Sequence, residues 1–198
     1  MKPIYALVSV SDKSKLELLI YLTRLGVKLI STGGTANTLR ELGFEVIDIS
    51  DFTGMEEMMN GRIKTLHPKV CGGILTQRDR SDDMADADKH DMPHISFVIC
   101  NFYPFKDKPS IENIDIGGPT MVRGAAKNYM HETVLTDPGD YLKLAGLLNH
   151  LGITSFEDYQ AASIMFRYEL AAKAMRHTAD YDKMIADWMA QNAPRDWL

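Results

Sequence analysis

The sequence has few cysteines, no long apolar run and no excess of positive charge. Its two cysteines, Cys71 and Cys100, give no disulfide framework and no CxxC pair, which favours a reducing compartment. No stretch reaches the roughly 18 to 20 apolar residues that a membrane span requires. The apolar run at residues 1–8 meets Ser9 and Asp12 too soon for a signal peptide. These absences predict a cytoplasmic protein that does not insert into membranes.

The charge balance is acidic, with 22 Lys and Arg against 27 Asp and Glu residues and a formal net charge of -5. Binding the phosphate backbone of a nucleic acid needs a basic face, so a nucleic-acid partner is not expected. A few well-placed cations still suffice to hold one phosphate group. The length of 198 residues and the hydrophobic content of 45% fit one globular domain plus an extension, or two small domains.

Short apolar strands alternate with helical segments over residues 1–150. Strands are expected at residues 4–10, 28–31, 46–49, 95–101 and 133–135, and helices at residues 16–25 and 35–42. This alternation predicts a three-layer α/β/α domain in which helices cover both faces of a mainly parallel sheet. Ligands of such sheets bind at the edge where the carboxyl ends of the strands meet.

Residues 151–198 are predicted to form a helical extension that belongs to the same unit. Ser155 and Asp158 resemble a capping box, and apolar residues recur at helical spacing over residues 161–175 and again over residues 181–189. We expect these helices to pack on the sheet domain or on a partner. The acidic stretch at residues 79–91 is interpreted as a solvated helix face or loop.

The turn at residues 31–35 joins a predicted strand to a helix through two glycines. Gly33 and Gly34 let the backbone approach an anion, toward which the first amides of the helix point. Thr32 and Thr35 add hydroxyl donors. The turn predicts a phosphate site, but an ordinary turn with Thr35 as the helix N-cap stays open. It matches neither the P-loop nor the dinucleotide fingerprint.

Cations occur in two further segments. Residues 9–13 bring Lys13 beside the glycine turn if the first two strands are neighbours, although Ser-Asp-Lys is also a good helix start. Arg62 and Lys64 are two positions apart and point the same way from an extended segment. That arrangement suits a dianionic ligand or a developing oxyanion, and ordinary surface cations are the alternative.

Polar groups suited to catalysis follow the strand at residues 95–101 and open a later helix. Asn101 and Tyr103 offer an amide and a phenol that can read a heterocycle or pass a proton. Asp115 precedes a glycine pair at a predicted helix start, and Lys127 follows beside small alanines on that helix. Lys127 with Asp115 could act as a tuned acid and base, while a solvated lysine is the alternative.

A metal site is not supported by the histidines. His90 and His94 have helical i,i+4 spacing, but Pro93 breaks the helix that would align them.

Taken together, these segments resemble the IMP cyclohydrolase domain of the bifunctional purine-biosynthesis protein. The resemblance rests on residues 11–13, 32–35, 62–68, 100–104, 115–118 and 125–128, and residues 170–174 and 177–182 resemble the end of that domain. The Lys-Thr-Leu-His-Pro and Asp-Ile-Gly-Gly segments are highly specific, whereas the Thr-Gly-Gly-Thr turn is shared by the wider methylglyoxal-synthase-like fold. The departures are a short segment between Pro104 and Ile111, and Pro119 where relatives often have Val.

The resemblance implies an enzyme, a hydrolase of the class acting on cyclic amidines. It would close the formamido ribotide FAICAR to IMP in the last step of de novo purine biosynthesis, without a metal or cofactor. In this hypothesis Lys127 and Asp115 transfer protons, Lys64 stabilises the developing oxyanion, and Tyr103 orients the carboxamide with Asn101. The expected substrate-binding residues are Ser11, Asp12, Lys13, Thr32, Gly33, Gly34, Thr35, Arg62, Ile63, Thr65, Cys100, Asn101, Ile116 and Gly117.

Two other functions stay open at this point. A lyase of the methylglyoxal-synthase type would use the same turn on a triose phosphate, with a carboxylate base and a histidine nearby. A non-catalytic nucleotide-sensing module would need the turn but not Lys64, Tyr103, Asp115 and Lys127. The resemblance and the apolar tail favour a homodimer. The transformylase domain that would follow this tail in the family is a further expected partner.

Overall fold

The core of the fold is a five-stranded sheet in the order β3-β2-β1-β4-β5, and every neighbouring pair is parallel. The computed structural model describes residues 2–193. The strands are β1 (Ile4–Val10), β2 (Lys28–Ser31), β3 (Val46–Asp48), β4 (His94–Asn101) and β5 (Thr133–Leu135). These bounds confirm all five predicted strands to within one residue at each end. The two long strands, β1 and β4, lie side by side at the centre.

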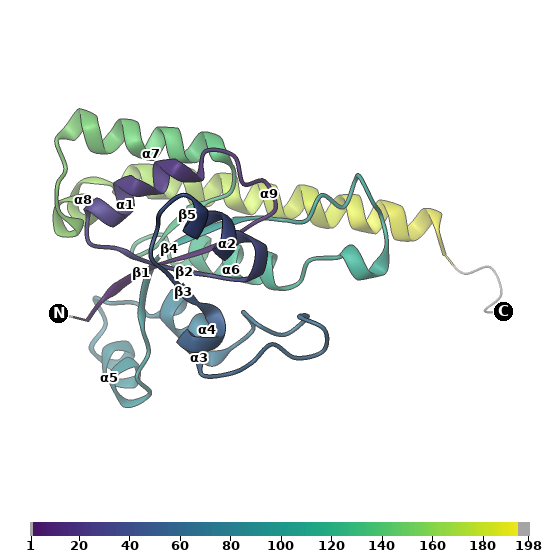
Figure 1. Cartoon of the computed structure of the whole chain (residues 1–198), viewed down its shortest axis with the longest axis horizontal. Coiled ribbons are helices and arrows are strands. Elements are labelled where there is room, and N and C mark those ends of the chain that lie inside the picture. Colours follow the sequence, from purple (N-terminus) through teal and green to yellow (C-terminus); the bar gives the residue numbers. More distant parts are fainter. Residues whose placement is uncertain (1, 194–198) are drawn as a thin grey trace.

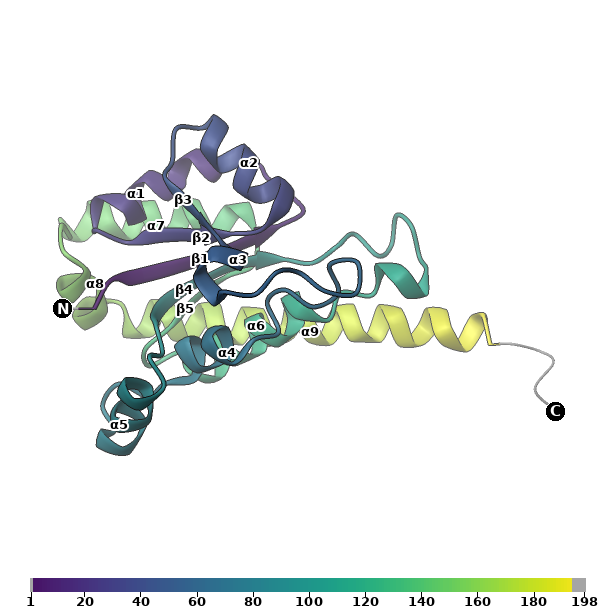
Figure 2. The same cartoon turned by 60° about the horizontal axis from the view of Figure 1, so that its bottom comes forward.

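Helices cover both faces of the sheet, which confirms the predicted three layers (Figures 1 and 2). Successive side chains of a strand point to opposite faces, so Ala6 and Val8 of β1 face one layer and Leu7 faces the other. The first layer contains η1 (Leu16–Leu19), α1 (Ile20–Arg24), α2 (Gly33–Glu41), α7 (Pro138–Leu151) and α8 (Phe156–Ala162). The second contains α3 (Ile49–Thr53), α4 (Pro68–Leu75), α6 (Gly117–Lys127) and α9 (Ile164–Gln191).

Two short helices lie outside these layers. The acidic stretch forms α5 (Ser81–Lys89), in which Ala87 is the one buried residue, so the prediction of a solvated helix is confirmed. Residues Ile111–Asn113 form η2, a single turn on the path from β4 to α6.

The tail differs from the sequence prediction in where its helices begin and end. Ser155 caps α8 as expected, accepting the Asp158 amide at 3.1 Å and donating to its carboxylate at 2.7 Å. The first predicted stretch, residues 161–175, is divided at Ser163 between α8 and α9. From Ile164 onward it is continuous with the second stretch in α9, because the buried stripe runs without interruption past Thr178 to Tyr181 and Ile185. The division into residues 1–150 and 151–198 stays a prediction. Residue 1 and residues 194–198 of that division lie outside the described residues.

Among the helices of residues 2–193, none is both long enough and apolar enough to cross a membrane.

Candidate functional site

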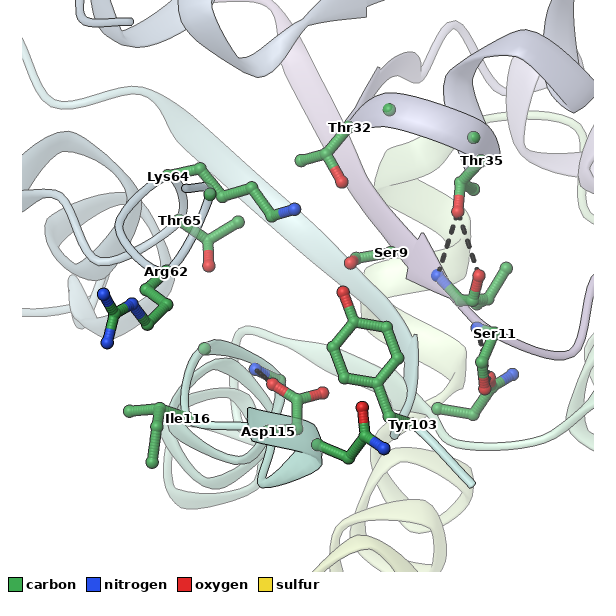
Figure 3. A pocket seen from close by; sticks show the side chains of 18 of the residues that line it. Ser9, Ser11, Thr32, Thr35, Arg62, Lys64, Thr65, Tyr103, Asp115 and Ile116 are labelled. Atoms are coloured by element: carbon green, nitrogen blue, oxygen red, sulfur yellow. Dashed lines mark hydrogen bonds between the residues drawn. The ribbon is translucent and has the colours of Figure 1, made fainter. Parts of the chain in front are cut away.

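A cleft of about 820 Å³ opens at the edge of the sheet where the strands end. Its walls come from the loop after β1, the turn that begins α2, the loop at residues 60–65, the segment after β4 and the start of α6. In Figure 3, Lys64 and Tyr103 enter the cleft from opposite sides. The amino group of Lys64 points toward Thr32, and the hydroxyl of Tyr103 points toward Ser9. This is the sheet edge at which open α/β folds bind their ligands.

The glycine turn forms the amino-terminal end of α2 and faces this cleft. Gly33 has a φ of +43°, a left-handed conformation that glycine adopts without strain. The amides of Thr35 and Ala36 make the first helical hydrogen bonds, to the Thr32 carbonyl at 3.2 and 3.3 Å. The amides of Gly33 and Gly34 precede them and have no place in the helix ladder. Together with the positive end of the helix dipole, these two amides have the geometry that anions favour at helix N-termini.

The hydroxyl of Thr35 belongs to the wall of the cleft. It donates to the Val10 carbonyl at 3.0 Å and accepts from the Val10 amide at 3.3 Å, which fastens α2 to the end of β1. Thr35 was expected to donate its hydroxyl proton to the ligand, but that proton is already committed to the Val10 carbonyl. The alternative, Thr35 as the helix N-cap, is also corrected, because the helix begins at Gly33 and Thr32 occupies the N-cap position.

Asn101 joins the loops that follow β1 and β4. Its Oδ1 accepts the amides of Ser11 and Asp12 at 2.7 and 2.9 Å, and its Nδ2 donates to the Asp12 carbonyl at 3.2 Å. The Ser11 hydroxyl reaches the Phe102 carbonyl at 2.6 Å. We call these four residues the Asn101 lock. The prediction that Asn101 orients a substrate carboxamide is corrected in part, because its amide oxygen is committed to the chain and one Nδ2 proton remains outside the lock.

The residues that the structure describes bring three predicted cations to the cleft, namely Lys13, Arg62 and Lys64. Lys13 lies beside the glycine turn, since its Nζ would be 3.1 Å from a side-chain carbon placed on Gly34. From the loop at residues 60–65, Lys64 points its amino group toward Thr32, whereas the Arg62 guanidinium points away from Ser9 and Tyr103 in Figure 3. This distribution attracts an anionic ligand in a protein whose overall charge is negative.

A small hairpin directs Arg62 and Lys64. Backbone hydrogen bonds of 2.9 and 3.2 Å join Met58 to Ile63, and the Arg62 Nε donates to the Met59 carbonyl at 3.0 Å. Ile63 was expected to contact the substrate. It supplies the backbone of the hairpin instead and does not line the cleft.

Asp115 is a partly buried acid at the start of α6. Its Oδ1 accepts the Gly118 amide at 2.8 Å, and the Tyr103 amide also donates to this carboxylate. Burial raises the pKa of Asp115 above its ordinary value, while the two amides and the charge of Lys64 lower it. The net direction is upward, which moves the group toward the pH range where it can exchange a proton.

The glycine pair at the start of α6 permits this close packing. A side-chain carbon on Gly117 would lie 2.6 Å from the Thr65 Oγ1, and one on Gly118 would lie 2.5 Å from the Asp115 Oδ2. Both approaches are too short for any residue except glycine. The pair predicted from the sequence as a source of exposed amides therefore also makes room for Thr65 and Asp115.

Lys127 is not brought to this cleft. It is the last residue of α6, ten positions beyond Gly117, which corresponds to a rise of about 15 Å along the helix. The sequence prediction placed Lys127 on one face of the helix with Thr120 and Arg123, but it did not weigh this distance along the axis. Within one chain, Lys127 is therefore absent from the lining that contains Asp115.

Two other predicted contacts also lie outside the cleft lining. Cys100 is 1% exposed, and burial strongly raises the pKa of its thiol, so it is part of the core. The Asp12 carboxylate accepts the amide and the hydroxyl of Ser14 at 2.9 and 2.7 Å, and these hydrogen bonds lower its pKa. Asp12 thus orders the start of the following helix, as the alternative interpretation of that segment allowed.

The cleft also contains residues that the sequence analysis did not select. Ser9 alternates with Ser11 along the end of β1, a signal that would have included it. Val10, Gly61 and Gly118 stand within or beside the segments already discussed but were not among the expected site residues. The others have no motif of this kind: Asn60, Ile111, Glu112, Asn113, Ile114 and Met121. Residues 2–193 hold no group of three or more His, Cys, Asp or Glu side chains placed to bind a metal.

Two family models match the sequence, each over a different part of the chain. A model of the MGS-like domain matches residues 15–120, more than half of the chain and most of the cleft. The chain belongs to the MGS-like domain family. A second model, the AICARFT/IMPCHase bienzyme, matches residues 125–197, which include β5 and helices α7 to α9.

Individual relatives agree with these matches. The chain is 45% identical over 194 residues to the bifunctional purine biosynthesis protein PurH of Bacillus subtilis. The matched region covers 93% of this chain and 36% of that protein. The PurH of Streptococcus suis is 44% identical over 201 residues, and the match covers 96% of this chain and 38% of that protein. The chain thus spans little more than a third of these relatives. The crystal structure of ForH superimposes with a TM-score of 0.84 at 35% identity, covering 97% of this chain and all of that one.

Proposed function

We propose that this MGS-like protein is an IMP cyclohydrolase, which closes FAICAR to IMP with loss of water. The observation that carries the proposal is a cleft with two chemically different ends. One end holds the glycine turn with Lys13, the other holds Tyr103 and Asp115, and Lys64 enters the space between them with its amino group pointing toward Thr32. A ribotide has the same division, with a phosphate at one end and the reacting arms of the base at the other. The matches to the bienzyme family and to two PurH proteins support the same reaction.

The phosphate end would anchor the ribotide. The amides of Gly33 and Gly34 and the ammonium of Lys13 offer donors to the phosphate oxygens. Arg62 and Thr65 line the cleft from the loop at residues 60–65 and would hold the rest of the ribotide. Such an anchor converts ring closure into a reaction between groups whose relative positions are already restricted.

At the other end, the carboxamide nitrogen would form a bond to the formyl carbon. The formyl oxygen then leaves as water, with one proton from the carboxamide nitrogen and one from the formamido nitrogen. Asp115 would take the first proton and deliver it to the oxygen, because its raised pKa suits both steps. The charge of Lys64 would stabilise the oxygen as it becomes negative, and the Tyr103 hydroxyl would orient the carboxamide.

The test is to incubate the purified chain with FAICAR and follow the purine absorbance of IMP. We expect IMP to form as FAICAR disappears, and we expect Asp115→Asn to abolish its formation. Tight IMP binding without turnover would contradict the proposal and favour a nucleotide sensor. Formation of methylglyoxal from dihydroxyacetone phosphate would favour a lyase. That reaction needs a histidine near the turn, and the described residues that line the cleft include none.

Homodimer formation and a linked transformylase domain are further parts of this proposal, supported by the resemblance and by the longer PurH relatives. Sedimentation equilibrium of the chain tests the first. A mass of one chain, against 22.3 kDa from the sequence, would contradict it.

A further inference from the structure

Tyr181 of α9 lies beneath the segment that carries Asp115. It is 4% exposed, and its hydroxyl makes hydrogen bonds only to that segment in the described part of the chain. The hydroxyl accepts the Asp115 amide at 2.9 Å and donates to the Asn113 carbonyl at 3.3 Å. A single phenol therefore spans the backbone on both sides of Ile114, immediately before the acid of the cleft.

The same helix holds the neighbouring segment, which carries Tyr103. The ring of Phe102 lies 4.9 Å from the ring of Tyr181 and 4.4 Å from the ring of His177, measured between centroids. About two turns beyond Tyr181, Trp188 meets the ring of Phe105 edge-on at 5.6 Å. Both ends of the Tyr103 segment are thus packed on α9, while Tyr103 itself is half exposed and points into the cleft.

We propose that Tyr181 is a positioning residue for ring closure, which fixes the Asp115 carboxylate opposite Lys64 through its two hydrogen bonds. The inference rests on the proposed function and adds to it a contribution from the tail. Asp115 lies in the part of the chain that matches the MGS-like domain, whereas Tyr181 lies in the part that matches the bienzyme family. The tail thereby gives a shared phosphate-binding fold an acid held for a particular reaction.

The hydroxyl is what distinguishes this role from simple packing. A phenylalanine at position 181 keeps the ring against Phe102 and removes both hydrogen bonds to the loop. The Asp115 amide then loses its acceptor, and the loop gains freedom to move its carboxylate away from the amides of Gly118 and Tyr103. A displacement of about 1 Å at such a position can lower turnover about 10²-fold.

The Tyr181→Phe change should also alter the pKa of Asp115, which depends on the groups around its carboxylate. Lys64 faces it across the cleft, Cys100 lies behind it on β4, and Tyr103 and Tyr181 approach it from the adjoining segment and from α9, with Asp182 next to Tyr181. Burial is the largest influence on the carboxyl and raises its pKa. A loosened loop admits water, so the pKa of Asp115 should fall toward the ordinary value in the variant.

The kinetic experiment compares Tyr181→Phe with Tyr168→Phe, a change to an exposed tyrosine on the same helix. We expect kcat of Tyr181→Phe to fall about 10- to 100-fold. The KM for FAICAR should remain close to that of the unchanged chain, because the phosphate anchor is untouched. The acid limb of the pH profile should move to lower pH. Tyr168→Phe should alter none of these, and equal kinetics for both variants would overturn the proposal.

A second measurement does not depend on activity. In the unchanged chain, hydrogen exchange of the Asp115 amide should be slow although it lies in a loop, and fast exchange would overturn the proposal even if the variant failed to fold. Carbon-13 NMR titration, assigned with Asp115→Asn, should show a lower Asp115 pKa in Tyr181→Phe. An unchanged titration also overturns it. If the chain made no IMP, the proposed function would fail. Hydrogen exchange of the Asp115 amide and the NMR titration of its carboxyl group would still decide the role of Tyr181.

Discussion

At the scale of single residues, the cleft contains side chains that build its wall and side chains that face its space. Thr35 and Asn101 hydrogen-bond to the chain itself and hold two loops in place. Lys64 and Tyr103 instead project into the space from opposite sides. Substitutions of Thr35 or Asn101 should therefore disturb the shape of the site. Substitutions of Lys64 or Tyr103 should instead change the groups available to the ligand.

The lysine that faces the cleft should be needed for turnover. We expect Lys64→Ala to lower kcat by about 10²–10³-fold, the usual effect of removing one donor that stabilises a developing negative charge. Lys143→Ala on α7 is the matched control, since that residue is exposed and outside the cleft lining. Steady-state kinetics with FAICAR measure both. Turnover of Lys64→Ala within a few-fold of the control would remove Lys64 from the mechanism.

The pH dependence should reflect Asp115. Because burial raises its pKa and the ionised form must accept a proton, activity should be lost as the pH falls through a value above that of an ordinary aspartate, about 3.9. Lys64→Ala removes a charge that lowers this pKa, so the acid limb of its residual activity should move to higher pH. The pH profiles of kcat/KM for the two proteins measure this. A shift in the opposite direction would contradict the assigned contact.

The same shift has a consequence for stability, whose sign follows from proton binding. Between the ordinary and the raised pKa, the folded chain binds more protons at Asp115 than the unfolded chain does. The contribution of Asp115 to the free energy of unfolding therefore decreases as the pH rises through this window.

At the scale of elements, α9 packs on α6 through small side chains. Ala171 and Ala174 of α9 share a buried cluster with Ala125 and Ala126 of α6, which lets the two helices approach closely. We expect Ala174→Leu to lower the free energy of unfolding by about 1–3 kcal/mol, because the site has no room for three more carbons. Urea denaturation measures this change. Ala179→Leu, at an exposed position of the same helix, should leave stability nearly unchanged.

The elements also show which information is local and which is not. The strands and the glycine turns follow from composition over a few residues, so they could be predicted. The continuity of α9 could not, because Thr178, Ala179 and Asp180 look like a break until Thr178 is seen to be buried within the helix's contact face. The positions of Lys127, Thr35 and Asn101 depend on helix length or on hydrogen bonds to distant segments, which no local pattern contains.

At the scale of the molecule, a buried ion pair joins elements at the opposite edge of the sheet. Arg78 donates to the Glu132 carboxylate at 2.8 Å and to the Ile95 carbonyl at 2.6 Å, and the Glu132 side chain is 0% exposed. We expect Arg78→Met to lower the free energy of unfolding by about 3–5 kcal/mol, because it leaves a buried charge without its partner. Thermal and urea unfolding measure this loss. Arg80→Met, which breaks an exposed pair with Asp82, should have little effect, and equal losses would contradict the argument.

The Asn101 lock has a consequence for how the whole chain folds and responds to ligands. It joins Ser11 to a residue 90 positions away, so the cleft cannot be assembled by either part of the chain alone. A ligand that needs the assembled cleft binds only the folded state, and it should stabilise the whole cooperative unit. At a concentration of 100 times its dissociation constant, that stabilisation is about 2.7 kcal/mol. The thermal transition of the entire chain therefore reports on occupancy of the cleft.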